Sequence, residues 1–491
     1  MMEGATPVLR TQEQRGVRNF PFERFSSSRR VTRREGLGLA AAGLGFSSLP
    51  AVAAPDVTSR GESPGFGKAR SIILIYASGG QSQLDLWDPK PEAPAEVRGA
   101  FQPISTAVPG LQFCEHMPRL ARIADRMTVV RSMSHEDLDH GSATYLALTG
   151  QYHAQRSANP PPRPQDLPTF GAVLKRVRPS STLPYTAVHL NGPALVPELP
   201  APGQNAGFLG YGFDPLLLGD VTESPVPLRG LEPLSDVTTA RMNRRRSLLE
   251  SVEGACDWLE RNPALLEMQG VYRQAYDLLA ESQVRHAFDL SRESAETRER
   301  YGMNRSGQAC LMARRLVEAG APWVTVVWCP SNRGQDNAPD DTDRYGWDTH
   351  NDIFESLRER LLPRFDQGLS ALLLDLEERG LLDETLVVCM GEFGRAPLVA
   401  LESRFAGATP GRKHWSHAYS IVMAGAGIAR GAVYGASDRQ GAYPKSNPVG
   451  PWDISATMFA ALGIDPAGHY DDLTNRPFPI SIGKPVADLY G

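Results

Sequence analysis

The segment 381–395 constrains the fold of this chain more than any other part of the sequence. A short acidic turn, Asp383-Glu384, is followed by the apolar run 385–390, which predicts a buried strand. The run ends in Glu392, a carboxylate with a glycine close on either side. In open α/β sheets, ligands and catalytic groups lie just beyond the carboxyl ends of the strands. The segment therefore predicts Glu392 as a metal ligand or an acid–base group of an α/β protein; the alternative is an exposed loop glutamate.

Apolar runs and helical patterns alternate along much of the remaining chain. Further strands are predicted at 71–76, 127–130, 186–190, 323–328 and 419–424, and helices at 117–124, 140–149, 169–177, 308–319, 353–379 and 454–462. The alternation predicts a doubly wound, mostly parallel sheet flanked by helices, formed by residues 70–191 and 308–491. Residues 192–307 are rich first in Pro, Gly and Leu and then in Arg, Glu, Leu and Ala, which predicts a mostly helical insertion or cap.

The N-terminal region has the composition of an export signal. Residues 1–34 hold eight arginines and no lysine, and a weakly apolar run of small residues follows the pair Arg33-Arg34. An A-x-A-type cleavage site ends at Ala53. We therefore expect 1–53 to be a cleaved twin-arginine signal, with the twin-arginine export machinery as partner and a periplasmic or secreted location. The alternative is a basic disordered tail.

A linker at 54–69 is expected to follow this signal, because the stretch is rich in Pro, Gly and Ser. The apolar run within the signal is too short and too weak for a transmembrane anchor. The twin-arginine route carries proteins that are already folded, which suits a metal site assembled before export.

Charge and cysteine content exclude several classes of protein. The net charge of −5 and the pI near 6.1 argue against a nucleic-acid-binding protein, which would carry a concentrated basic face. The five cysteines are scattered and no C-x-x-C spacing occurs, so the sequence indicates neither a zinc knuckle nor a disulfide framework.

Polar residues that bind metals gather at the predicted strand ends. Five of the ten histidines fall there: His135, His140, His350, His414 and His417. Asp348 and His350 are two residues apart, so in an extended loop they can project to one side and chelate one ion. Imidazole and carboxylate are the usual ligands of zinc. A single histidine is more often an ordinary hydrogen-bonded residue, but several such loops together favour a metal or catalytic site.

Several segments resemble known families. The segments 381–395, 117–150 and 452–465 resemble motifs of the alkaline phosphatase and sulfatase superfamily, in the same order along the chain. The segments 79–91, 346–350 and 411–415 more closely resemble a family of twin-arginine-exported proteins known as domain of unknown function 1501. The resemblance covers roughly residues 70–480 and implies an alkaline phosphatase-like core.

The superfamily resemblance implies a divalent metal, zinc or calcium. The ligands that it implies in this chain are Asp348, His350, Glu392 and His414. Phe393 stands where the superfamily has a metal-binding histidine, and phenylalanine cannot bind metal. The superfamily's first metal-binding aspartate is also missing, and Asp85 is the nearest carboxylate. His417 is a second ligand or a substrate contact; the alternative is that it packs beside Trp415.

The sulfatase spacing points to a catalytic residue. In sulfatases the catalytic cysteine lies ten residues before the glycine that corresponds to Gly150. The residue at that position in this chain is His140. Imidazole can act as a covalent nucleophile, or it can supply the ligand that Phe393 lacks. The alternative is that His140 only caps a helix or bonds to Asp137 or Asp139.

Substrate contacts are expected from two kinds of group. Backbone N–H groups of Gly79 and Gly80, together with Ser82, could form an anion cradle. Arg131 and Arg395 flank strand ends and could hold a phosphate or sulfate, with Arg395 steadying charge during catalysis. Surface ion pairs are the alternative for both arginines.

These inferences predict an exported metal-dependent hydrolase of phosphate or sulfate esters, with a small-molecule or saccharide ester as substrate. The alternative is a non-catalytic ligand-binding or scaffold protein on the same fold with a degenerate metal site. The loss of a hydroxyl or thiol nucleophile favours the alternative, whereas the clustered histidines and carboxylates favour the hydrolase.

Overall fold

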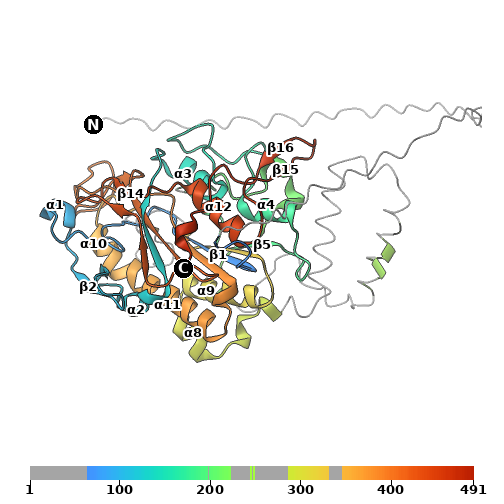
Figure 1. Cartoon of the computed structure of the whole chain (residues 1–491), viewed down its shortest axis with the longest axis horizontal. Coiled ribbons are helices and arrows are strands. Elements are labelled where there is room, and N and C mark those ends of the chain that lie inside the picture. Colours follow the sequence, from blue (N-terminus) through green and yellow to red (C-terminus); the bar gives the residue numbers. More distant parts are fainter. Residues whose placement is uncertain are drawn as a thin grey trace, which may run out of the picture. The chain divides into compact units, whose positions relative to one another are not determined.

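A central sheet of eight strands organises the described part of the chain (Figure 1). In spatial order its strands are β12 (Ala432–Tyr434), β4 (Thr128–Met133), β11 (Tyr419–Ala424), β8 (Thr385–Met390), β1 (Ser71–Tyr76), β7 (Trp323–Val327), β5 (Ala187–Leu190) and β6 (Leu216–Leu218). β1 pairs in parallel with β7 and β8, and β5 pairs in parallel with β7 and β6. β11 runs antiparallel to both β4 and β8. The predicted mostly parallel α/β sheet is confirmed.

The computed structural model describes residues 64–222 except 197, then 286–330 and 346–491, with isolated positions between 241 and 251. These segments belong to one unit of the chain, Asp56–Gly491. The predicted signal 1–53 and most of the linker lie outside the described residues. No helix among the described residues is long and apolar enough to cross a membrane.

Helices cover both faces of the sheet because its strands are apolar on both faces. On β1, Ile73 and Ile75 pack into one core cluster, and Ile72 and Leu74 pack into another. The first cluster contains side chains of α2 (Pro118–Arg122), α8 (Ala295–Tyr301), α9 (Arg305–Glu318), α10 (Ile353–Ser356) and α11 (Leu362–Glu378). The second contains side chains of α3 (His140–Thr149), α4 (Phe170–Val177) and α12 (Pro451–Ala461). The sheet is therefore doubly covered, as predicted.

Short elements complete the described fold. Four two-stranded sheets pair β2 (Pro103–Ser105) with β3 (Gln112–Cys114), β9 (Gly394–Arg395) with β10 (His414–Trp415), β13 (Ala436–Ser437) with β14 (Pro444–Ser446), and β15 (His469–Asp471) with β16 (Pro477–Pro479). The remaining short helices are α1 (Ala95–Arg98), η1 (Ala124–Arg126), η2 (Gly207–Leu209), η3 (Tyr211–Phe213), η5 (Leu290–Arg292), the π-helix η7 (Leu357–Leu361), η8 (Leu382–Glu384) and η9 (Ala487–Leu489). The helix predicted at 353–379 is thus built from α10, η7 and α11.

The segment expected to be an insertion contributes to the core. β6 falls within 192–307 and pairs with β5 at the edge of the central sheet. α9 begins at Arg305, before the expected boundary, and its apolar face is part of the first core cluster. Most of 223–285 lies outside the described residues, so a helical cap there stays a prediction.

Candidate metal centre

The candidate site forms where the carboxyl ends of neighbouring strands meet. β8 ends two residues before Glu392, and the chain leaving β4 reaches His140 at the first position of α3. His414 lies on β10, just before the antiparallel strand β11, so it reaches the same edge from the opposite direction. Asp348 and His350 come from the chain after β7. One edge of the sheet therefore brings together residues that are up to 274 positions apart, from His140 after β4 to His414 before β11.

One carboxylate oxygen, Oδ1 of Asp348, is the centre of the cluster. It lies 3.2 Å from Nε2 of His140, 3.1 Å from Nε2 of His350 and 3.2 Å from Nε2 of His414. The Nε2 atoms of His350 and His414 are 2.9 Å apart. A guanidinium nitrogen of Arg395 lies 2.6 Å from the same oxygen. Asp348, His350 and His414 therefore lie together as expected, and His140, expected as a nucleophile or a substitute ligand, lies beside the same oxygen.

The outer nitrogens of two imidazoles fix which nitrogen carries the proton. Nδ1 of His414 lies 2.7 Å from the carbonyl oxygen of Leu138, which can only accept, so Nδ1 donates. Nδ1 of His140 lies 2.5 Å from the carboxylate of Glu392 and donates to it. When neutral, both rings then point an Nε2 lone pair toward Oδ1 of Asp348, which is itself an acceptor. A metal ion placed between these acceptors would be coordinated by them, and without one the proton that His140 retains compensates the charge of Asp348.

The donor set fits a zinc-like ion. Ligand atoms of His140, Asp348 and His414 all lie within 4.8 Å of one another. Nε2 of His140 is buried and makes no hydrogen bond within the described residues. Imidazole nitrogen with one carboxylate oxygen is a usual zinc set, whereas calcium takes oxygen ligands throughout. Of the two predicted metals, the residues suit zinc and not calcium.

The electrostatics of the cluster keep the carboxylate charged and two imidazoles neutral. Burial opposes charging of His140, but Asp348 and Glu392 outweigh it and raise the pKa of His140 to about 9. Burial would favour a neutral Asp348, yet the charges of His140 and Arg395 hold its pKa well below the ordinary value. Burial, and then the charge of His140, lowers the pKa of His414 to about 4, and burial also lowers that of His350. Neutral His350 and His414 are the forms that bind metal.

Glu392 lies behind His140 and does not bind at the centre of the cluster. Its Oε1 accepts from Nδ1 of His140 and from the backbone N–H of Gly79 at 2.8 Å. Its Oε2 accepts from the hydroxyl of Tyr76 at 3.1 Å, and that hydroxyl is 2.7 Å from the hydroxyl of Thr144. The prediction of Glu392 as a direct ligand is corrected, because its oxygens are taken by His140, Gly79 and Tyr76.

Arg395 and the glycine pair support the cluster from inside the protein. The guanidinium of Arg395 is fully buried and donates to the carbonyls of Gly79 and Gly80 as well as to Asp348. The N–H of Gly79 is directed at Glu392, so it is not free to cradle an anion. The prediction is corrected for Gly79, whereas a role of the Gly80 N–H in binding an anion stays a prediction, and Arg395 is placed as the partner of Asp348.

Asp85 and Ser82 belong to a different buried ion pair. Both carboxylate oxygens of Asp85 accept from Arg412, at 2.7 and 3.0 Å, and the hydroxyl of Ser82 donates to it at 2.5 Å. The side chains of Asp85 and Arg412 are 0% exposed. The predictions of Asp85 as a metal ligand and Ser82 as a substrate contact are therefore corrected, because bidentate pairing with an arginine uses the whole carboxylate.

Arg131 pairs with Asp88 and not with the metal cluster. Its guanidinium lies 3.2 Å from Asp88 and donates to the carbonyl of Trp87 at 2.5 Å. The prediction of Arg131 as a substrate contact is corrected. It forms a partly buried ion pair instead.

His417 packs among aromatic rings. Its ring lies 5.1 Å from that of Trp415 and 5.7 Å from that of Tyr443, measured between centroids. This is the packing alternative stated for His417. A role in binding substrate stays a prediction.

Three supporting groups were missed by the sequence analysis. The ring of Phe405 stacks on His350 with centroids 3.7 Å apart and planes 5° apart. The carbonyl of Leu138 orients His414, and the hydroxyl of Tyr76 holds Glu392. A carbonyl has no side-chain signal in a sequence, and Phe405 lies in a loop without a periodic pattern. Only Tyr76, the last residue of a predicted strand, stood at a position that pointed to the site.

An open α/β sheet with a histidine–aspartate cluster at its carboxyl edge defines this protein as an α/β protein with a candidate metal centre. The chain belongs to the family described as protein of unknown function DUF1501, whose model matches residues 69–490. The predicted family is thereby confirmed. The sequence matches none of the curated proteins with which it was compared.

Similar solved structures share little sequence with this chain. The PsFucS1 sulfatase from Pseudoalteromonas sp. is 13% identical, with 88% of this chain and 72% of that chain covered and a TM-score of 0.38. A protein in the alkaline phosphatase superfamily from Vibrio parahaemolyticus is 12% identical, with coverages of 84% and 71% and a TM-score of 0.40. The phosphonate monoester hydrolase SpPMH from Silicibacter pomeroyi is 12% identical, with coverages of 84% and 75% and a TM-score of 0.36.

Proposed function

We propose that this protein is an exported, metal-dependent hydrolase of phosphate or sulfate esters. The observation that carries the proposal is the convergence of His140, Asp348 and His414, whose ligand atoms lie within 4.8 Å of one another at the carboxyl edge of the sheet. Perturbed pKa values cluster at functional sites, and the buried groups His140, Asp348 and His414 all have them. His350 adds a further imidazole beside the same oxygen.

His140, Asp348 and His414 would hold a zinc-like ion, with His350 as an additional donor. Such an ion would supply Lewis-acid polarisation of an ester oxygen and compensation of its charge. The proposal assigns His140 to the ligand set and not to nucleophilic attack, because Nδ1 is engaged by Glu392 and Nε2 faces Asp348.

The residues around the cluster position its donors. Glu392 fixes the tautomer and ring orientation of His140, and the Leu138 carbonyl does the same for His414. Arg395 holds Asp348 and keeps it ionised. Each donor is therefore oriented before substrate arrives, which is the arrangement that an active site requires.

A water molecule is the attacking group in this proposal. Ser142 donates to the carboxylate of Asp137, and the hydroxyl of Thr144 is bonded to Tyr76. Both hydroxyls are buried and occupied within the described structure. The proposal therefore assigns neither hydroxyl as the attacking group.

The second candidate is a metal-binding protein without hydrolytic activity. It is favoured by the position of His350, whose Nε2 is 3.1 Å from Oδ1 of Asp348 and 2.9 Å from Nε2 of His414. Structural zinc sites use four protein ligands, whereas catalytic sites keep one position open. A set of three histidines and one aspartate would close the site.

Hydrolysis of aryl esters separates the two candidates. The protein would be loaded with zinc and assayed with p-nitrophenyl phosphate and p-nitrophenyl sulfate. The hydrolase proposal expects turnover of at least one ester, its loss in Asp348→Asn, and its retention in His469→Ala, an exposed histidine on β15. Stoichiometric metal with no turnover of either ester would reject the hydrolase and support the second candidate.

Export is tested separately. The mature protein is expected to begin near Ala54 or Pro55, and replacing both Arg33 and Arg34 by lysine should block export. An exported protein that retains residues 1–53, or unchanged export of the lysine variant, would contradict this part of the proposal.

A further inference from the structure

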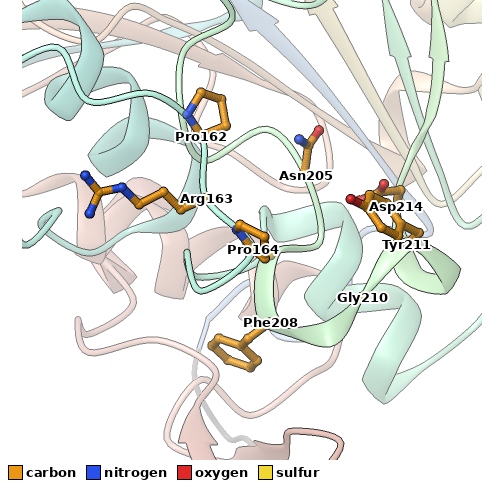
Figure 2. A pocket seen from close by; sticks show the side chains of 9 residues that line it. Pro162, Arg163, Pro164, Asn205, Phe208, Gly210, Tyr211 and Asp214 are labelled. Carbon is orange, nitrogen blue, oxygen red and sulfur yellow. The ribbon is translucent and has the colours of Figure 1, made fainter. Parts of the chain in front are cut away.

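A pocket of about 340 Å³ opens between two loops that contribute no residue to the metal cluster (Figure 2). One loop brings Pro162 and Pro164, and the other runs through η2 and η3 and brings Asn205, Phe208 and Tyr211. This volume is at the lower end of the range of small-molecule sites, about 300–1,000 Å³. The pocket therefore has room for a ligand of the size of a mono- or disaccharide.

The two loops are bonded to each other, so the pocket is formed before any ligand arrives. The N–H of Phe208 donates to the carbonyl of Asp166 at 3.1 Å, and the N–H of Thr169 donates to the carbonyl of Asn205 at 2.9 Å. Gly207 has a φ of +51°, and a Cβ there would lie 1.9 Å from the carbonyl oxygen of Asp166. Only glycine permits this close approach of the loops. A preformed site loses less conformational entropy on binding.

The ring of Tyr211 lies at the pocket and takes no part in the aromatic packing of the described fold. Tyr211 is 75% exposed and its ring contacts no other aromatic ring of the described chain. Phe208 is different, because its ring is 4.3 Å from that of Phe478 and is anchored there. The pocket thus has one fixed aromatic wall and one ring open to solvent. Flat apolar faces of this kind pack against the C–H faces of sugar rings.

The polar groups at the pocket suit hydroxyl groups. The side-chain amide of Asn205 has no hydrogen-bond partner among the described residues, and it offers both donors and an acceptor. Asp214 lines the pocket, and its Oδ1 accepts from the N–H of Ala206 at 2.6 Å, which fixes the carboxylate. The guanidinium of Arg163 extends away from Tyr211 and Asp214 in Figure 2. Arg163 also lines the pocket, but the polar groups beside Tyr211 are an amide and a carboxylate, which suit hydroxyl groups and disfavour an anionic ligand at that end.

We propose that this pocket binds a neutral saccharide, with Tyr211 against the face of a sugar ring and Asn205 and Asp214 on its hydroxyls. The site is separate from the metal centre and does not depend on the proposed hydrolase activity. It would attach the protein to a glycan whether or not that glycan is also a substrate.

Saturation-transfer NMR with cellobiose, maltose and lactose tests the proposal on the full protein. At least one of these sugars should bind saturably. Tyr211→Ala should weaken its binding about tenfold or more, whereas Tyr211→Phe, which keeps the ring, should change it less than about twofold. Tyr211 is largely exposed, so the alanine variant should unfold at the temperature of the wild type.

His140→Ala separates this site from the metal centre, because it should leave sugar binding unchanged. The proposal is overturned if none of the sugars binds, or if Tyr211→Ala binds them as the wild type does. Loss of binding in His140→Ala would place the sugar at the metal centre instead and also overturn it. Preference for glucuronic acid over the neutral sugars would contradict the neutral ligand.

Discussion

Nδ1 of His140 lies 2.5 Å from Oε1 of Glu392, on the side of the imidazole away from Asp348. Glu392 is 1% exposed and is fixed by Gly79 and Tyr76. It therefore orients His140 rigidly and increases the basicity of its Nε2. Glu392 is a positioning residue that acts on the centre through His140.

Glu392→Gln should lower zinc affinity by about 10–100-fold, the usual effect of removing a carboxylate behind a ligating histidine. Competition with a chromophoric chelator measures the affinity. Glu384→Gln is the matched control, because Glu384 is half exposed and pairs with Arg70. Equal affinity in Glu392→Gln and the wild type would show that Glu392 has no influence on the centre.

The stability of the metal-free protein should fall as pH rises through the titration of His140. Its pKa is raised from 6.5 in the unfolded reference to about 9 in the folded protein. Between pH 6.5 and pH 9 the folded state therefore keeps a proton on His140 that the unfolded state loses. The contribution of this proton to the free energy of unfolding is complete below pH 6.5 and is lost as the pH rises through 9. Urea midpoints of chelator-treated protein across this window measure the slope. His140→Gln should flatten the curve, and an unchanged slope in that variant would contradict the assignment.

Asp85→Asn should destabilise the protein without removing metal. Breaking a buried ion pair leaves Arg412 uncompensated and costs roughly 3–5 kcal/mol. Thermal unfolding should show a lower midpoint, while metal per folded chain stays at the wild-type value. Loss of metal at unchanged stability would restore Asp85 as a ligand.

The sheet could be predicted because its strands are continuous apolar runs. The bounds 71–76, 385–390 and 419–424 agree with those of β1, β8 and β11. Once strand direction is known, the polar residues after each strand must meet at one edge. Asp348 and His414 were expected at this edge from their positions near predicted strand ends together with the superfamily resemblance.

Several of the failed predictions concern groups whose partners are distant in sequence. Asp85 was expected at the metal, but Arg412, 327 residues later, takes both of its oxygens. Glu392 was placed correctly at the strand end. Whether it binds metal or orients His140 depends on the distance between its carboxylate and that imidazole, which cannot be read from the sequence. Glycine and arginine patterns indicated an anion site, whereas Arg395 uses its donors on carbonyls and Asp348.

Phe405→Ala should weaken zinc binding modestly. The ring stacks on His350, and such aromatic contacts contribute about 0.5–1.5 kcal/mol, or roughly a twofold to tenfold change in affinity if His350 is a ligand. Phe405 is 38% exposed, so the thermal midpoint should hardly change. Leu401→Ala, at a more exposed position in the same loop, is the control. No change of affinity would show that His350 stands outside the ligand set.

The metal content of the purified protein tests the central claim most directly. After exposure to zinc and removal of free metal, elemental analysis should give about one ion per wild-type chain. Asp348→Asn and His414→Ala should each fall below about a tenth of that value, with His469→Ala unchanged. A wild-type protein that retains no metal, or an Asp348→Asn variant that retains as much as the wild type, would contradict the metal centre.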